Sequence, residues 1–106
     1  MATGKLGSGD LAATTLTTIY ECPADTFTVA SVSFCNRGNS AVAVRLALAD
    51  AATPTDAEWL EYDVEVLGKG VLERTGIVLK ATEKLVVYSS ATNVTAVAFG
   101  IETSTA

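Results

Sequence analysis

Acidic side chains concentrate in the middle of this 106-residue chain. Six of its twelve Asp and Glu residues lie between positions 50 and 65, namely Asp50, Asp56, Glu58, Glu61, Asp63 and Glu65. Hard cations such as Ca²⁺ bind several oxygen atoms at once, so this segment is a candidate calcium site. A contact with basic residues of a partner protein is the alternative use of the same charges.

The spacing of Glu61, Asp63 and Glu65 argues against the calcium site. These residues alternate with Tyr62 and Val64, and on a β-strand the successive residues of one face lie about 7 Å apart. Carboxylates that diverge in this way do not share one ion without help from a loop. We therefore expect a solvated strand face, whose charge discourages edge-to-edge association, and no metal site.

Trp59 and Tyr62 are a second candidate site, because exposed aromatic rings can stack on sugars. A regular strand places residues three positions apart on opposite faces. The two rings therefore form a platform only if the chain bends between them. We expect both side chains to pack in the core or in an interface.

The two cysteines, Cys22 and Cys35, are predicted to be free. If the turn at residues 23–26 joins two antiparallel strands, Cys22 lies near Phe27 and Cys35 near Thr14, which is too far for a disulfide. We expect two small, buried hydrophobic side chains, with an inter-strand bridge in another pairing as the alternative. The chain has no histidine and no Cys-x-x-Cys pattern, so a zinc site is not expected.

No residue pattern indicates catalysis or a cofactor. The chain has no histidine to act as a general base and no Gly-x-Ser-x-Gly nucleophile elbow. The Gly7-Ser8-Gly9 stretch does not lie between a strand and a helix, as a phosphate-binding loop would. We expect no catalytic, cofactor-binding or metal-binding residues, and we predict that the chain is not an enzyme.

The stretch from residue 26 to residue 49 indicates the fold class most clearly. In its second half the apolar residues Val42, Val44, Leu46 and Leu48 alternate with Ala43, Arg45, Ala47 and Ala49. A period of two is typical of a half-buried strand. Turn-forming residues occupy positions 36–40, so we predict a hairpin of residues 27–36 with residues 42–49. The first of these strands is apolar on both faces, which predicts a sandwich interior, a subunit on its outer side, or a bulge near Ser31.

Other strands are predicted at residues 14–22, 59–66, 71–79 (broken at Gly76), 85–88 and 94–102. Residues 56–60 could hold one helical turn with Asp56 as its N-cap. Seven to eight short strands, separated by turns at intervals of about 8–12 residues, are typical of a sandwich. We predict an all-β fold: a single antiparallel β-sandwich of immunoglobulin-like or jelly-roll type. Residues 11–102 would form it, between a flexible, glycine-rich N-terminal arm (1–10) and a C-terminal tail (103–106).

The composition indicates which kinds of partner the chain could bind. Hydrophobic residues make up 49% of the chain and charged residues 18%, below the usual value of about 25%, and surplus apolar surface is typical of a subunit contact. The net charge is −5 and the seven basic residues are scattered, so we expect no nucleic-acid partner. No run approaches the ~20 apolar residues of a membrane-spanning helix, and residues 1–10 do not look like a signal peptide.

Several sequence segments resemble those of a class of viral protein. They are residues 17–26 (TTIYECPADT), residues 32–37 (VSFCNR), and the final part of the chain from 76–79 (GIVL) through 85–90 (LVVYSS) to 98–102 (AFGIE). In this layout the chain resembles small β-sandwich structural proteins of tailed-bacteriophage virions. The resemblance implies a non-enzymatic capsid decoration (cement) protein, or alternatively a collar, neck, tail or baseplate component. A carbohydrate-binding β-sandwich module is a further alternative.

This resemblance sets the expected partners and location. The protein would form a homo-oligomer, a trimer if it decorates a capsid, and would bind the major capsid protein or other virion proteins. It would be located in the virion, which is assembled in the cytoplasm of the host bacterium. Deleting residues 1–9 is expected to weaken binding to the particle and to leave the fold intact.

Overall fold

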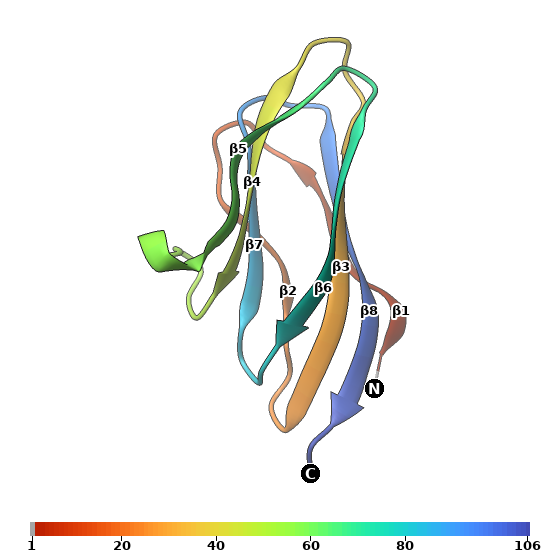
Figure 1. Cartoon of the computed structure of the whole chain (residues 1–106), viewed down its shortest axis with the longest axis vertical. Coiled ribbons are helices and arrows are strands. Elements are labelled where there is room, and N and C mark those ends of the chain that lie inside the picture. The colour runs from red at the N-terminus through yellow and green to blue at the C-terminus, as the bar shows by residue number, and fades with distance from the viewer. Residues whose placement is uncertain (1) are drawn as a thin grey trace.

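Two layers of antiparallel strands face each other in the computed structural model, which describes residues 2–106 (Figure 1). The elements are β1 (Thr3–Leu11), β2 (Thr17–Glu21), β3 (Thr26–Asn36), β4 (Val42–Ala49), the 3₁₀ helix η1 (Asp56–Glu58), β5 (Trp59–Val66), β6 (Val71–Leu79), β7 (Lys84–Ser89) and β8 (Val94–Ser104). The first sheet has the order β1-β8-β3-β6 and the second sheet the order β2-β7-β4-β5. Among the described residues, no helix is long and apolar enough to cross a membrane.

The pairing of the strands is nested around the β4–β5 connection. β4 pairs with β5, β3 with β6, β2 with β7 and β1 with β8. The chain is therefore one long antiparallel ribbon, and the pairs β3–β8 and β4–β7 complete its two sheets. An eight-stranded double sheet of this kind is a jelly roll. The predicted antiparallel β-sandwich is confirmed, and the strand order selects the jelly roll over the immunoglobulin-like arrangement.

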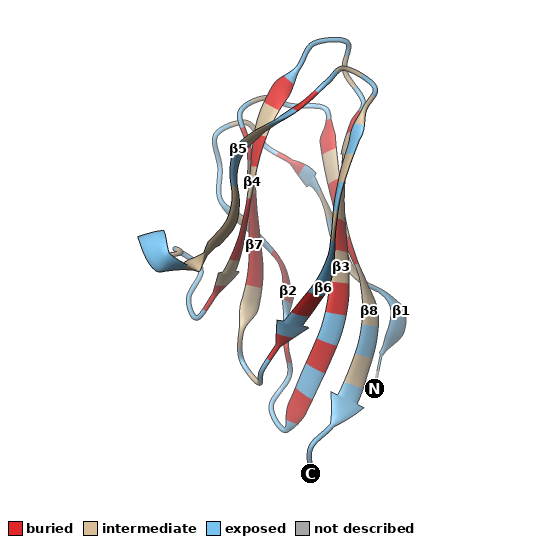
Figure 2. Ribbon diagram, viewed as in Figure 1, coloured by how far each residue is buried: buried red, intermediate tan, exposed pale blue. Residues whose placement is uncertain are grey.

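The core lies between the two sheets, and Figure 2 shows the alternation of buried and exposed residues along β3. Val32 and Phe34 of β3 belong to the same fully buried cluster as Val44 and Leu46 of β4. Each such aliphatic or aromatic side chain contributes about 1.5–3 kcal/mol through burial. The alternation along β3 is unbroken, because the register shift opposite Ser31 comes from one extra residue in β6.

The predicted hairpin of residues 27–36 with residues 42–49 is wrong. Both strands exist, but β3 belongs to the first sheet and β4 to the second. The connection between them, residues 37–41, therefore crosses from one sheet to the other as an arch. An alternating pattern cannot distinguish a hairpin from an arch, because each strand buries one face in both cases.

The arch is organised by the side chain of Asn36, which is only 1% exposed. Its Nδ2 donates hydrogen bonds to the carbonyl oxygens of Ser40, Val66 and Leu67 at 2.8, 3.1 and 3.2 Å. Its Oδ1 accepts a hydrogen bond from the Gly38 N–H at 3.0 Å. One amide group thus ties the arch to the turn between β5 and β6.

Residues 3–10 of the segment predicted as a flexible arm form a strand instead, and Met1 lies outside the described residues. β1 pairs with β8 from Thr3 opposite Ile101 to Leu11 opposite Val94, and Leu11 is buried in the core. Glycine here serves close packing, since a Cβ on Gly7 would lie 1.9 Å from the carbonyl oxygen of Ile19. At the other end, β8 continues to Ser104 and includes half of the predicted tail.

The turn predicted before β5 forms, with a different cap. η1 spans Asp56–Glu58, and its N-cap is Thr55 rather than Asp56. The Glu58 carboxylate accepts hydrogen bonds from the backbone N–H groups of Thr55 at 2.8 Å and Asp50 at 3.0 Å. These bonds lower the pKa of Glu58 and close the loop that precedes β5.

Candidate functional site

The outer side of the first sheet is apolar over its central strands. Val29 of β3 lies opposite Ile101 of β8 on one side and Val78 of β6 on the other, and the three side chains are 44%, 55% and 56% exposed. The same side of the sheet carries Phe27, Val97 and Phe99. We call these six residues the apolar face. Alternation alone groups residues within one strand, and the pairing of β3 with β8 and β6 brings the six together.

Charged side chains on this side of the sheet lie only on its edge strands. The register places Lys5 and Asp10 of β1 and Glu73 of β6 on the outer side. β3 has no charged residue, and the one charged residue of β8, Glu102, pairs with the inward-facing Thr28. The apolar face is therefore nearly neutral in a chain of net charge −5.

The cysteines are free, as predicted. The hairpin assumed for that prediction does not form, because β2 and β3 belong to different sheets. Cys22 is fully buried, with its Sγ 3.3 Å from both the Thr26 carbonyl oxygen and the Thr28 Oγ1. The expected burial is wrong for Cys35, which is only partly buried because it lies on the outer side of β3, opposite Val71.

Glu61 does not share a face with Asp63 and Glu65, so the predicted row of three carboxylates is wrong. Glu61 lies opposite the inward-facing Leu46 and forms an ion pair of 2.7 Å with Arg74 of β6, which closes the open edge between the sheets. Asp63 and Glu65 are both exposed, and Asp63 forms an ion pair with Arg45. The described residues contain no group of three or more His, Cys, Asp or Glu side chains that could hold a metal ion.

Irregular pairing of β5 with β4 causes this arrangement. The register shifts between Val44 and Leu46 and again between Leu46 and Ala47, and Asp63 has a φ of +55°. Each extra residue on one strand re-aims the side chains beside it. Trp59 and Tyr62, expected on opposite faces, are brought together by this bend, with ring centroids 5.2 Å apart at an angle of 74°.

Arg45 lies at the centre of these aromatic rings, on the outer side of the second sheet. Its guanidinium carbon is 4.1 Å from the ring centroid of Tyr62, 4.3 Å from that of Tyr88 and 6.0 Å from that of Trp59. Its Nε and Nη2 donate to the two carboxylate oxygens of Asp63 at 2.6 and 3.3 Å. We call these five residues the aromatic–arginine cluster.

Hydrogen bonds keep Arg45 and Asp63 of the cluster charged, and packing holds Trp59 in place. The hydrogen bonds to Asp63 raise the pKa of Arg45 and lower the pKa of Asp63, so both groups stay charged at neutral pH. Beneath the cluster, Trp59 packs on the fully buried Ala47, Ala49 and Val86. The sequence prediction missed Arg45 and Tyr88, although a lone arginine inside an otherwise apolar alternating strand was a usable signal.

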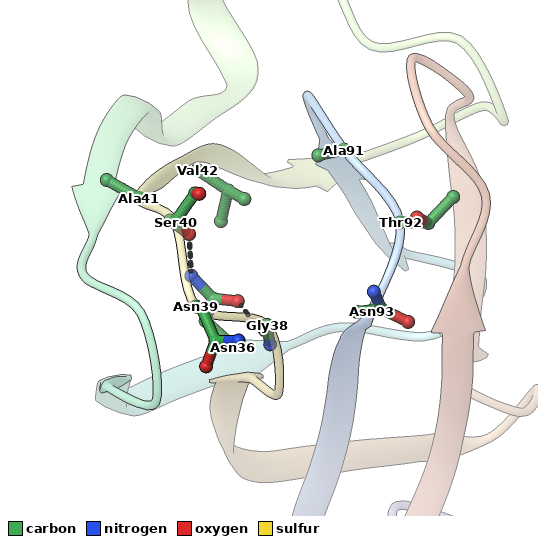
Figure 3. A pocket seen from close by; sticks show the side chains of 9 residues that line it. All are labelled: Asn36, Gly38, Asn39, Ser40, Ala41, Val42, Ala91, Thr92 and Asn93. Atoms are coloured by element: carbon green, nitrogen blue, oxygen red, sulfur yellow. Dashed lines mark hydrogen bonds between the residues drawn. The ribbon is translucent and has the colours of Figure 1, made fainter.

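A small pocket of about 210 Å³ lies between the arch and the β7–β8 connection (Figure 3). Its polar lining consists of neutral amide and hydroxyl groups from Asn36, Asn39, Ser40, Thr92 and Asn93. The Asn36 amide already bonds to the arch, and within residues 2–106 every buried side-chain nitrogen or oxygen atom has a hydrogen-bond partner. The pocket is smaller than the ~300 Å³ at which ligand sites begin, and its side chains carry no group that titrates near neutral pH.

A polar network lies at the opposite end of the sandwich. The Tyr20 hydroxyl is 2.8 Å from Thr28 Oγ1 and donates to Glu102 Oε2 at 2.5 Å, while Glu102 Oε1 accepts from the Ala2 N–H at 2.9 Å. Burial raises the pKa of Tyr20, and the hydrogen bond to Glu102 raises it further. The Tyr20 hydroxyl and the Ala2 N–H, which both donate hydrogen bonds to Glu102, lower the pKa of its carboxyl group. The network therefore stabilises the fold with Tyr20 neutral and Glu102 ionised.

We expect this network to limit stability at both ends of the pH range. The stabilisation from Glu102 is present above its ordinary pKa of 4.5 and is lost as the pH falls through its lowered value. The stabilisation from Tyr20 is present below its ordinary pKa of 10.0 and is lost as the pH rises toward its raised value. Thermal unfolding against pH should show a plateau with a fall on both sides. Glu102→Gln should flatten the acid side and Tyr20→Phe the alkaline side, and an acid side unaltered in Glu102→Gln would contradict the assignment.

No protein-family model, curated protein or solved structure matches this chain.

Proposed function

We propose that this chain is a non-enzymatic structural protein of a tailed-phage virion, which decorates the capsid and binds both the shell and its own copies. The observation that carries the proposal is the apolar face. Three aliphatic side chains more than 40% exposed form a row across three strands there. Contiguous exposed apolar surface on a soluble domain is typical of a protein–protein contact.

The occupant that best fits the apolar face is a second copy of the chain. Two molecules of net charge −5 repel each other, so self-association favours the surface with the least charge. The central strands β3 and β8 offer such a surface, because they present no charged side chain on it. Sheets pack face to face at a spacing of about 10 Å, and a sheet can pack in this way on its own two-fold copy.

The size of the apolar face predicts a weak contact. The three strands that carry it, spaced about 4.8 Å apart and roughly 25–30 Å long, offer a footprint of about 400 Å², below the ~800 Å² per partner of a standard interface. Isolated molecules would thus associate only at high concentration. On a particle many such contacts act together, and the high local concentration makes each one effective.

The assignment to a virion is supported by the resemblance of residues 17–26, 32–37, 76–79, 85–90 and 98–102 to small phage structural proteins. Jelly rolls are also common among viral capsid proteins, which is an analogy of fold and carries no function by itself. The partner in the particle would be the major capsid protein. A place in the collar, neck, tail or baseplate is the alternative within the same proposal.

We expect Val29→Lys to abolish self-association. In wild-type protein the mass measured by light scattering should rise with concentration from 10.9 kDa toward twice that value, because a two-fold contact closes at two copies. A lysine in the row of Val29, Val78 and Ile101 would place like charges at the contact. The variant should stay at the mass of one chain.

Leu67→Lys is the matched control, because Leu67 is 65% exposed but lies in the β5–β6 connection and not on the apolar face. It should associate as the wild-type protein does, and both variants should melt cooperatively. A wild-type mass of one chain at every concentration, or equal association by Val29→Lys, would remove the basis of the proposal.

The place in the particle needs a separate measurement. Quantitative mass spectrometry of virions purified from a lysate that expresses this chain should find it in a fixed ratio to the major capsid protein. A copy number close to that of the shell subunit supports decoration, whereas a small fixed number supports the neck or tail. Loss of the chain from purified virions would contradict a structural role.

A further inference from the structure

The aromatic–arginine cluster has features that packing alone does not require. Trp59 is the residue that covers Ala47, Ala49 and Val86. Tyr62 stands beside it with 55% of its surface exposed, and it reaches the outer side only because β5 is irregular and Asp63 takes a φ of +55°. A non-glycine residue in this conformation costs free energy, and such residues cluster at functional sites.

We propose that the aromatic–arginine cluster binds a neutral glycan, a function beyond the proposed assembly role. The exposed part of the Tyr62 ring offers an apolar surface for the C–H face of a pyranose. The Asp63 carboxylate, whose side chain is 46% exposed, can accept hydrogen bonds from sugar hydroxyls beyond those it accepts from Arg45. The guanidinium has five N–H donors, of which Nε and Nη2 each bond to Asp63, so others remain for hydroxyl oxygens.

The charge balance of the cluster selects an uncharged ligand. Arg45 and Asp63 neutralise each other at 2.6 Å, and the hydrogen bonds between them hold both in the ionised form. A phosphate or carboxylate would compete with Asp63 for the guanidinium, and a cationic group would compete with Arg45 for the carboxylate. A polyol makes bonds to both without separating the pair.

The cluster is also rigid before any ligand arrives. The guanidinium is stacked against Tyr62 and Tyr88 and is fixed by Asp63, while Trp59 is fixed against Tyr62 and the apolar floor. Little side-chain entropy is therefore lost on binding. The site lies on the outer side of the second sheet, so it stays accessible when the apolar face of the first sheet is covered.

The experiment is a glycan array that displays neutral, sialylated and sulfated glycans, probed with the full chain. Hits are then titrated in solution, where Trp59, the single tryptophan of the chain, reports occupancy by its fluorescence. We expect at least one neutral glycan to bind and to change the Trp59 emission. Tyr62→Ala should weaken that binding about tenfold, which is the upper range of one aromatic contact. Leu67→Ala, in the β5–β6 connection and on neither the apolar face nor the cluster, should bind as the wild-type protein does.

Three outcomes would overturn the proposal: retention of no glycan, retention of charged glycans only, or equal affinity in Tyr62→Ala. Because Tyr62→Ala could disturb β5, its unfolding temperature is measured beside that of Tyr62→Phe, which keeps the ring and should keep the affinity. If no glycan binds to the cluster, the association test is unaffected, since Val29→Lys alters the opposite sheet.

Discussion

Replacing Asn36 by alanine is expected to lower the free energy of unfolding by about 3 kcal/mol or more. The substitution leaves three backbone carbonyl oxygens and the Gly38 N–H without the bonds that the amide supplies. A buried group that loses its partner costs about 1–3 kcal/mol, and the arch has no second side chain bonded to the same atoms. Urea-induced unfolding, followed by circular dichroism, measures the loss.

Two further variants separate the hydrogen bonds from the loss of volume. Asn36→Asp keeps the shape and the acceptor for Gly38, but it turns a carboxylate oxygen toward the carbonyl oxygens of Ser40, Val66 and Leu67. It should be at least as unstable as Asn36→Ala at neutral pH. Asn39→Ala, an exposed amide in the same arch, should unfold like the wild-type protein. Equal stability of Asn36→Ala and Asn39→Ala would show that the arch does not depend on this side chain.

Removal of residues 2–9 is expected to destabilise the whole fold, contrary to the sequence-based expectation for a flexible arm. The deletion takes away most of β1, leaves the edge of β8 unpaired and uncovers the core at Leu6. For a domain whose total stability is about 5–15 kcal/mol, losing an edge strand of a sandwich should lower the unfolding temperature by more than ~10 °C. Differential scanning calorimetry provides the test.

Controls at both ends of the chain make this result interpretable. Removing residues 105 and 106, which lie beyond the end of β8, should change the unfolding temperature little. Gly7→Ala should reproduce part of the loss, because its Cβ would meet the Ile19 carbonyl oxygen at 1.9 Å, whereas the nearest atom to a Cβ on Gly9 is 3.5 Å away. If the chain without residues 2–9 melts at the wild-type temperature, β1 is not an integral strand.

The sequence predicted the strands better than their partners. The boundaries of β3 and β4 were within one residue, because strict alternation of apolar side chains marks a strand that buries one face. Which strands pair depends on contacts between β1 and β8 or β3 and β6, which are far apart in the chain. No local pattern encodes those contacts, so the arch at residues 37–41 was mistaken for a hairpin turn.

The functional surfaces were predicted only in fragments. The bend in β5 has no signature in the sequence, since residues 59–66 alternate as perfectly as a regular strand. Without the bend, Tyr62 falls on the inner face and Glu61 joins Asp63 and Glu65 in a row of three acids that does not exist. The glycines of β1 also led to a wrong prediction. A glycine-rich composition indicates flexibility, but Gly7 is needed because a Cβ at this position would clash with the carbonyl oxygen of Ile19.

The central claim is that copies of this chain meet through the outer side of the first sheet. Ser31 lies on that side of β3, opposite Phe99 and two residues from Val29. A Ser31→Cys, Cys35→Ser protein therefore carries one accessible thiol at the contact, since Cys22 is fully buried. We predict that the rate of its alkylation by iodoacetamide falls as protein concentration rises, and that adding Val29→Lys restores the dilute rate. An alkylation rate independent of concentration in the protein that retains Val29 would contradict the claim.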